Sequence, residues 1–369
     1  MDTKGSIGVV QTKYFSFAEP PDELALESER TLGPVTLAYE TYGTLNRDRT
    51  NAILVAHALS GDAHAAGFYE GDSAPGWWDV MIGPGKAFDT DRYFVICSNV
   101  IGGCKGSTGP SSMNARTGKP YGLDFPVITI TDMVDAQRHL VDHLGIEKLL
   151  CVTGGSMGGM QALQWAVSFP EFPHAIVAMT PMARTGAWAV AVVETARRAL
   201  MADPAWDGTQ FTAYPERGWR AWTGVMSVLA GRTPRALAEI FEQPLEVLAW
   251  MDKLSADNQA NGFDASDWLY QSWAYQEHDV GSTPGFHGEV DAALASVLAR
   301  TLILAPPLDL FNPVLCAHEA ADAIEGAVLV EIPSAQGHQS AATASTDDVA
   351  FLNEEIGAFL NSIQAEEQP

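Results

Sequence analysis

Short runs of apolar residues recur along this chain, and longer stretches with helical spacing separate them. Within each run the apolar residues are continuous and do not alternate with polar ones, as expected for strands that are buried on both faces. An alternation of strands and helices predicts an α/β fold with a mostly parallel sheet flanked by helices. The predicted strands cover residues 35–39, 52–56, 93–97, 149–153, 175–179, 301–304 and 327–332.

Residues 183–299 follow a different pattern. Apolar positions recur there with helical spacing, as at 190–202 and 234–250, and no buried strand stands out. This stretch also holds seven of the ten tryptophans. We therefore predict that residues 1–182 and 300–369 form a core domain, and that 183–299 form a helical lid inserted between two strands of the sheet. The alternative is that these helices pack against the flank of the core and have no functional role.

The composition narrows the range of partners. The 369 residues include 21 Lys and Arg against 46 Asp and Glu, which gives a net charge of −25, and 47% of positions are apolar. Nucleic acid and anionic membrane surfaces are bound through clustered cations, so neither partner is expected. The four cysteines, Cys97, Cys104, Cys151 and Cys316, are widely spaced and contain no CxxC pair. We expect reduced thiols, no metal site and no disulfide framework.

The chain carries no visible signal for secretion or for a membrane. Its first residues lack the basic start and apolar run of a signal peptide, and no apolar stretch approaches the ~18 residues of a membrane span. These features predict a cytoplasmic protein.

A glycine-rich turn lies directly after the predicted strand 149–153. Residues 154–159 read Gly-Gly-Ser-Met-Gly-Gly, and a helical run follows them. A nucleophile elbow has this layout, because its serine occupies a strained turn and needs small residues two positions before and after it. Ser156 is then the nucleophile, and Gly154 and Gly158 are the small residues. A dinucleotide-binding turn and a purely structural turn are the alternatives, although the GxGxxG spacing of the first is absent.

A serine is a weak nucleophile unless a base and an orienting acid activate it. His338 follows the predicted strand 327–332, and Asp309 follows the strand 301–304. Both residues therefore lie beyond the carboxyl ends of parallel strands, at the sheet edge where Ser156 also lies. We predict that His338 is the general base and that Asp309 orients it, with Asp279 in the lid as a weaker rival.

An acyl-transfer site also needs backbone N–H groups that bind the developing oxyanion. Met157, directly after the nucleophile, is predicted to supply one of them. Leu59, in the loop after the strand 52–56, is predicted to supply the other. We expect the neighbouring His57 to hold the shape of this loop and to take no part as a base.

At this point the sequence resembles the homoserine O-acetyltransferase family of α/β-hydrolase enzymes. The resemblance rests on several long motifs in order: residues 39–46 (Tyr-Glu-Thr-Tyr-Gly-Thr-Leu-Asn), 57–61 (His-Ala-Leu-Ser-Gly), 76–79 (Gly-Trp-Trp-Asp), 82–86 (Ile-Gly-Pro-Gly-Lys), 102–110 and 154–160. It implies an α/β-hydrolase fold, a Ser156, Asp309 and His338 triad, a helical lid, and homodimers formed through the lid helices. It also implies that an acetyl group passes from acetyl-CoA to the serine and then to the hydroxyl of homoserine.

The chain departs from this family in the predicted acceptor site. The family has an aspartate for the substrate amine directly after the histidine, where this chain has Gln339. The family also has a lid arginine for the substrate carboxylate, at a position that corresponds to Thr223. Arg220 and Arg197 are possible substitutes, and Trp222 is a further candidate for substrate contact.

These departures favour a neutral substrate, because a zwitterion whose charges are desolvated without partners binds poorly. The main expectation from the sequence is therefore a cofactor-free serine esterase that hydrolyses small, short-chain esters, with acetyl esters as the expected substrates, through an acyl-Ser156 intermediate. The alternative is an O-acetyltransferase that takes acetyl-CoA as donor and homoserine, or another hydroxyl compound, as acceptor. A third, quite different reading is a non-catalytic binding protein on a degenerate hydrolase fold.

Overall fold

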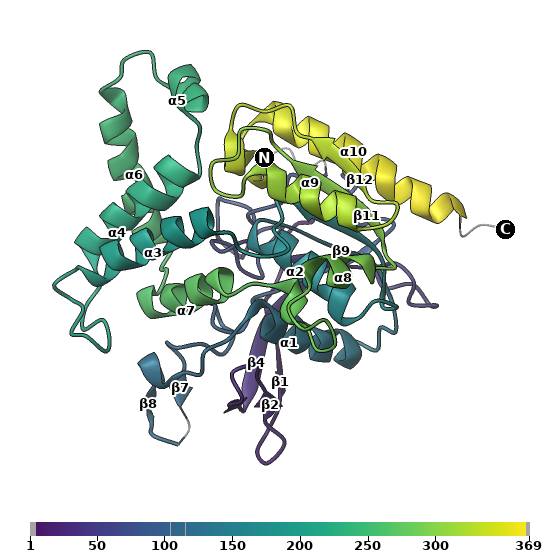
Figure 1. Cartoon of the computed structure of the whole chain (residues 1–369), viewed down its shortest axis with the longest axis horizontal. Helices are drawn as coiled ribbons and strands as arrows, with labels where there is room; N and C mark the ends of the chain where they lie inside the picture. The colour runs from purple at the N-terminus through teal and green to yellow at the C-terminus, as the bar shows by residue number, and fades with distance from the viewer. Residues whose placement is uncertain (1–4, 104, 115, 367–369) are drawn as a thin grey trace.

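The computed structural model describes residues 5–103, 105–114 and 116–366 of the chain. An eight-stranded sheet forms its centre (Figure 1). The six neighbouring strands from β6 to β12 pair in parallel, whereas β4 pairs antiparallel with both of its neighbours, β1 and β6. The predicted α/β fold with a mostly parallel sheet is therefore confirmed. The spatial order is β1 (Lys13–Phe17), β4 (Val35–Tyr42), β6 (Phe94–Ser98), β5 (Ala52–Ala56), β9 (Leu149–Gly155), β10 (Pro173–Met179), β11 (Arg300–Ala305) and β12 (Val328–Glu331).

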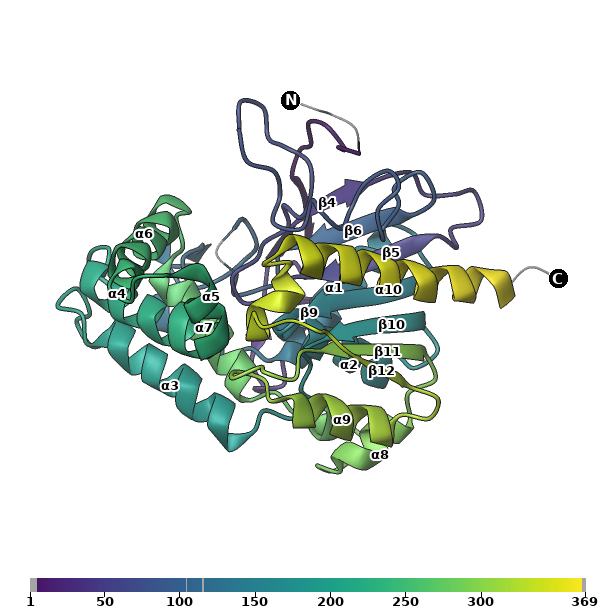
Figure 2. The ribbon, with the colours of Figure 1, turned by 90° about the horizontal axis from the view of Figure 1, so that it is seen from above.

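Two apolar cores cover the two faces of this sheet. Along β5, Leu54 packs into one core while its neighbours Ile53 and Val55 pack into the other, because successive side chains of a strand point to opposite faces. The first core is completed by α1 (Ile130–His143), α2 (Met157–Ser168), α8 (Val290–Ala295) and α9 (Val314–Ala323), and the second by α10 (Thr346–Glu366). Figure 2 shows α10 crossing one face of the sheet.

The segment between β10 and β11 is helical, and its helices from α3 to α7 form a lobe to one side of the sheet in both views, whereas α8 packs beside α9 on the core (Figures 1 and 2). Residues 180–299 are all described, and they contain no β-strand beyond isolated bridges. The lobe, called the lid below, comprises α3 (Ala187–Met201), α4 (Glu216–Thr223), the π-helix η2 (Gly224–Ala230), α5 (Pro234–Ile240), α6 (Glu246–Ala260) and α7 (Ala265–Gln276).

Small elements complete the chain. They are the hairpins β2 (Leu24–Ala25) with β3 (Thr31–Leu32) and β7 (Met113–Asn114) with β8 (Lys119–Pro120), and the 3₁₀ turns η1 (Gly122–Asp124), η3 (Val280–Ser282) and η4 (Gly337–Ala342).

Two elements differ from the sequence-based expectations. The helical pattern at 234–250 is divided between α5 and α6, because Pro244 lies between them and has no N–H to continue a helix. The edge strand β1 was not predicted, since half-exposed strands lack a continuous apolar run.

Cys97 and Cys151 are buried free thiols, and Cys316 is a partly buried one. Cys104 lies outside the described residues. Across the described ranges, no helix combines the length and the apolar character that crossing a membrane requires.

Candidate active site

Ser156 lies in a tight turn between β9 and α2. Its backbone φ is +59°, a left-handed value that is costly for a residue other than glycine. A Cβ at Gly154 or Gly158 would come within 2.3 or 2.1 Å of the Ala56 carbonyl oxygen, so both positions require glycine. The turn is held because the Ser156 N–H donates to the Met179 carbonyl at 2.9 Å and to Thr180 Oγ1 at 3.1 Å.

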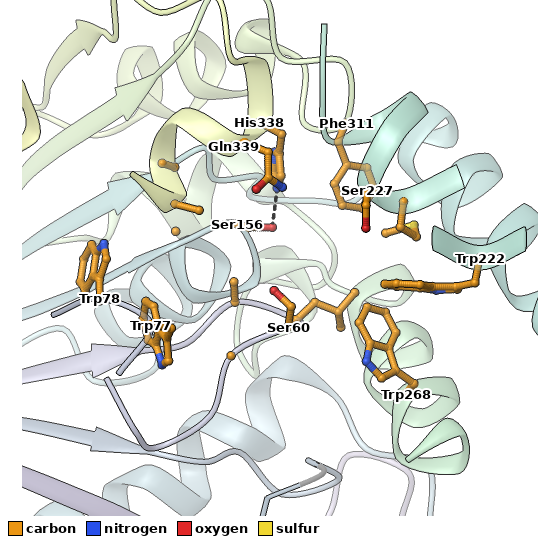
Figure 3. Close-up of a pocket in the computed structure, with 17 residues that line it drawn as sticks. Ser60, Trp77, Trp78, Ser156, Trp222, Ser227, Trp268, Phe311, His338 and Gln339 are labelled. Atoms are coloured by element: carbon orange, nitrogen blue, oxygen red, sulfur yellow. Dashed lines mark hydrogen bonds between the residues drawn. The ribbon is translucent and has the colours of Figure 1, made fainter. Parts of the chain in front are cut away.

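The three residues predicted to act together lie in one hydrogen-bonded chain, and Figure 3 shows its bond between Ser156 and His338. The Nε2 atom of His338, in η4, is 2.8 Å from Ser156 Oγ. The Nδ1 atom of His338 is 2.8 Å from Asp309 Oδ2, in the loop after β11. All three side chains are buried. The rival Asp279 is elsewhere, since it forms an ion pair with Arg184 at 2.8 Å.

The carboxylate of Asp309 is held by the loop that carries it. Its Oδ1 atom accepts hydrogen bonds from the backbone N–H groups of Phe311 (2.7 Å) and Asn312 (2.9 Å). The Phe311 ring also meets the His338 ring edge-on, with 5.0 Å between centroids. These contacts fix the direction of Oδ2, so the imidazole is oriented with its Nε2 atom toward the serine.

A second network beneath the triad was not foreseen from the sequence. The Tyr275 hydroxyl, from α7, donates to Asn312 Oδ1, and Asn312 Nδ2 donates to the Thr180 carbonyl at 2.7 Å. Burial, with a smaller contribution from the charge of Asp309, raises the Tyr275 pKa well above its usual value, so this hydroxyl remains a donor. No local motif marks Tyr275, because its role depends on a lid helix reaching the core.

The loop after β5 is the second wall of the site. Leu59 lines the pocket beside Ser156, and Met157 begins α2. Among the described residues, neither Leu59 N–H nor Met157 N–H has a hydrogen-bond partner. Both groups are therefore free to bind an oxyanion.

His57 is bound within this loop. Its Nε2 atom accepts from the Val100 N–H at 3.0 Å, so its proton lies on Nδ1, which donates to the Ala58 carbonyl at 2.7 Å. Burial lowers the His57 pKa and keeps the ring neutral. Both ring nitrogens are occupied, so His57 holds the loop and is not placed to act as a base.

The buried carboxylate of Glu40 stabilises the same loop through Tyr42. Glu40 is fully buried, and its oxygens accept hydrogen bonds from the hydroxyls of Tyr42 (2.9 Å) and Tyr69 (2.8 Å). Hydrogen bonds from these partners and from His64 outweigh burial and lower the Glu40 pKa. The Tyr42 oxygen in turn accepts from the Ala65 N–H at 2.8 Å. The motif at residues 39–46 thus has a structural basis that the sequence did not show.

The pocket lies between the core and the lid. Figure 3 shows Trp222 and Trp268 on the lid side, Trp77 and Trp78 on the opposite side, and Ser156 with His338 between them. Trp222 and Gln339, for which substrate contact is predicted, both line this pocket. In the described part of the chain, no carboxylate, lysine or arginine lines it.

Neither candidate arginine reaches the pocket. Arg220 is 64% exposed and pairs with Asp252, because on α4 it lies about 200° around the helix axis from Trp222. Arg197 is buried against Glu194 and Ser272 on α3 and α7. Thr223 is buried too, and its hydroxyl accepts from Asn258 Nδ2 at 3.0 Å.

The fold and the serine–histidine–aspartate arrangement define an enzyme of the α/β-hydrolase superfamily. The family model described as "alpha/beta hydrolase fold" matches residues 51–262. A homoserine O-acetyltransferase of Methanosalsum zhilinae is 42% identical over 98% of this chain and 75% of its own length. The chain belongs to the homoserine O-acetyltransferase family.

Two solved structures are equally close to this one. Homoserine O-acetyltransferase from Bacillus anthracis gives a TM-score of 0.85 at 31% identity, covering 96% of this chain and 98% of that one. Esterase E22 gives 0.84 at 31% identity, covering 95% and 100%. The fold alone therefore does not separate the two activities.

The comparisons overturn the main functional expectation. Ester hydrolysis was inferred from two acceptor-site positions, Thr223 and Gln339, but relatives similar over almost the whole chain are named homoserine O-acetyltransferases. The prediction of an esterase is wrong, and the acyltransferase alternative is the better supported. The error has a physical source. The same triad can activate either a water molecule or an alcohol to attack an acyl-serine, and the identity of two pocket residues does not determine which of them binds.

Proposed function

We propose that this protein transfers an acetyl group from acetyl-CoA to the hydroxyl of homoserine through Ser156. The observation that carries the proposal is similarity to named homoserine O-acetyltransferases along nearly the full chain, on a site where Ser156, His338 and Asp309 are already hydrogen-bonded.

In the first half-reaction, Ser156 Oγ attacks the thioester carbonyl while His338 Nε2 takes the serine proton. The N–H groups of Leu59 and Met157 stabilise the oxyanion. The C–S bond then breaks, the sulfur takes the proton from His338, and CoA leaves an acetyl-serine behind. Asp309 stabilises the imidazolium that exists between these proton transfers.

In the second half-reaction, the homoserine hydroxyl gives its proton to His338 Nε2 and attacks the acetyl-serine carbonyl. The same two N–H groups bind the new oxyanion. The bond to Ser156 breaks, Oγ recovers a proton from His338, and O-acetylhomoserine leaves. The enzyme returns to its starting state, as the symmetry of a two-step transfer requires.

The pocket walls include no carboxylate among the described residues, but they offer other groups that can bind the ammonium group of an amino-acid acceptor. The faces of Trp222 and Trp268 can attract an ammonium group through cation–π interactions, and the Gln339 amide oxygen can accept from it. Met226 and Phe311 add apolar surface that disfavours a competing water molecule.

We also propose that two copies associate through the lid. Large apolar side chains are exposed on η2, α5 and α6 or between these helices, which is typical of an interaction surface. They are Leu229, Ile240, Leu245 (78% exposed) and Leu248. Light scattering on Leu245→Glu combined with Leu248→Glu should show monomers. The matched Leu298→Glu, exposed outside this patch, should leave dimers, and a monomeric parent protein would refute the proposal.

The transferase proposal is tested with purified protein, acetyl-CoA and homoserine. We expect O-acetylhomoserine and free CoA in equal amounts, and much slower CoA release when homoserine is left out. Ser156→Ala protein should give neither product. Equal CoA release with and without homoserine, and no O-acetylhomoserine, would contradict the proposal.

A further inference from the structure

Arg232 differs from the lid arginines Arg220 and Arg235, because no acidic group among the described residues forms an ion pair with it. Its Nε and Nη1 atoms are buried, and within the described residues they have no hydrogen-bond partner. By contrast, Arg220 and Arg235 pair with Asp252 and Glu239. A guanidinium stays charged even when burial lowers its pKa, as it does here. Arg232 is partly buried, and taking two of its donor nitrogens away from water without a partner is costly, although a chain of net charge −25 has many acids that could have supplied one.

The backbone at Arg232 is fixed against the loop that carries the catalytic histidine. A Cβ at the preceding Gly231 would lie 3.1 Å from Gln339 Nε2, so the chain passes close to this pocket residue. The following Thr233 is buried, and its hydroxyl donates to the Ala335 carbonyl at 2.5 Å. A Cβ at Gly337 would lie 2.7 Å from Thr233 Cγ2. Contacts of the two neighbouring residues therefore hold the backbone of Arg232 beside the residues that flank His338.

Both substrates of the proposed reaction carry anionic oxygens, and the described pocket walls supply no lysine or arginine for them. We propose that Arg232 forms an anion subsite beside the pocket, which binds either the carboxylate of the acceptor or a phosphate of CoA. This inference rests on the proposed function for the identity of its ligands. A guanidinium suits both groups, because its N–H donors match the paired oxygens of carboxylate and phosphate.

The test measures binding by calorimetry, which needs no turnover, on the whole protein and three variants. Arg232→Gln removes the charge, Arg232→Lys keeps it, and Arg235→Gln is a control that removes an equal charge from an exposed arginine three residues away. Homoserine and CoA are titrated separately. We expect Arg232→Gln to raise the Kd of one of them roughly 10- to 100-fold, the range for a charge-assisted hydrogen bond. Arg232→Lys should recover part of the loss, and Arg235→Gln should bind as the parent protein does.

Two analogues identify the anion. 2-Aminobutane-1,4-diol lacks the carboxylate of homoserine, and pantetheine lacks the phosphates of CoA. The ligand that uses Arg232 should lose its sensitivity to Arg232→Gln when its anionic group is removed. Unchanged Kd values for both homoserine and CoA in folded Arg232→Gln protein would overturn the inference. Failure of the proposed function gives a different result, namely no O-acetylhomoserine from the parent protein whatever these Kd values are.

Discussion

Hydrogen bonds to the backbone fix the positions of Ser156 and Asp309 in this site. Ser156 is held by two hydrogen bonds to its backbone N–H, and the Asp309 carboxylate accepts two backbone N–H groups before it meets His338. Positions fixed before substrate arrives reduce the entropy lost on reaching the transition state. The chemistry therefore depends on a few groups acting as a unit.

Ser156→Ala and His338→Ala should each reduce acetyl transfer by at least about 1000-fold, and the double variant should be no slower than either single one. The reason is that the nucleophile and base act in the same proton transfer. Steady-state rates of the three folded variants check this. Multiplication of the two effects in the double variant would show that the residues act independently.

Gly158→Ala should destabilise the protein by roughly 1–3 kcal/mol, because the new Cβ would meet the Ala56 carbonyl oxygen at 2.1 Å. Elsewhere in a helix this substitution is stabilising, so the sign is informative. Gly155→Ala is the matched control, since its Cβ would have no neighbour closer than 3.5 Å. Urea unfolding measures both. Equal stability of the two variants would mean that the elbow is less constrained than described.

Helix α7 joins the lid to the core at several points along its length. Asp267 accepts from Ser111 N–H at 2.8 Å and from its hydroxyl at 2.6 Å, and the Tyr270 hydroxyl donates to the Phe125 carbonyl at 2.8 Å. Trp268 lines the pocket, and Tyr275 binds Asn312 beneath the triad. This helix therefore couples the position of the lid to the geometry of the site.

The buried carboxyl of Asp267 predicts a pH dependence of stability. Burial, with a contribution from the charge of Asp264, raises the Asp267 pKa to about 7. An unfolded aspartate has a pKa of about 3.9, so between these values only the folded state holds the proton. Asp267 thus stabilises the fold most below about pH 4, and this contribution falls as pH rises toward 7, by about 1.4 kcal/mol for each unit of pKa difference.

Asp267→Asn removes this titration. The free energy of unfolding of the parent protein, minus that of Asp267→Asn, should therefore decrease from pH 4.5 to pH 7.5. Urea titrations at the two pH values give the difference directly. A difference that stays constant with pH would show that the carboxyl does not titrate in this window.

Elements that depend on local pattern could be predicted, and those that depend on contacts between distant elements could not. Ser156 and Asp309 follow the buried strands β9 and β11, His338 follows the half-exposed edge strand β12, and parallel strands bring those ends to one edge. Arg220 looked like a substrate residue in sequence, but the helix turns it away from Trp222. Tyr275 and Arg232 carry no local motif, since their positions follow from how the lid meets the core.

At the scale of the whole molecule, the core carries Ser156, His338 and Asp309, and the lid provides the wall of the pocket that faces them. The sheet sets the three triad loops at one edge, while Trp222 and Trp268 close the pocket from the lid lobe. The identity of the acceptor depends on that far wall and on the loop around Gln339. Esterase E22 and the Bacillus anthracis acetyltransferase share this architecture at almost equal TM-scores. The acceptor of this protein must therefore be identified by assaying its reaction and cannot be read from the fold.

The most direct test of acyl transfer follows one acetyl group through a single turnover. The protein is mixed with acetyl-CoA labelled in the acetyl group, quenched, and analysed by mass spectrometry, and a second sample is chased with unlabelled homoserine before quenching. We predict that the label first appears on the peptide containing Ser156 and then moves to O-acetylhomoserine faster than it appears as acetate. Label that never reaches Ser156, or that leaves it only as acetate in the presence of homoserine, would contradict the account.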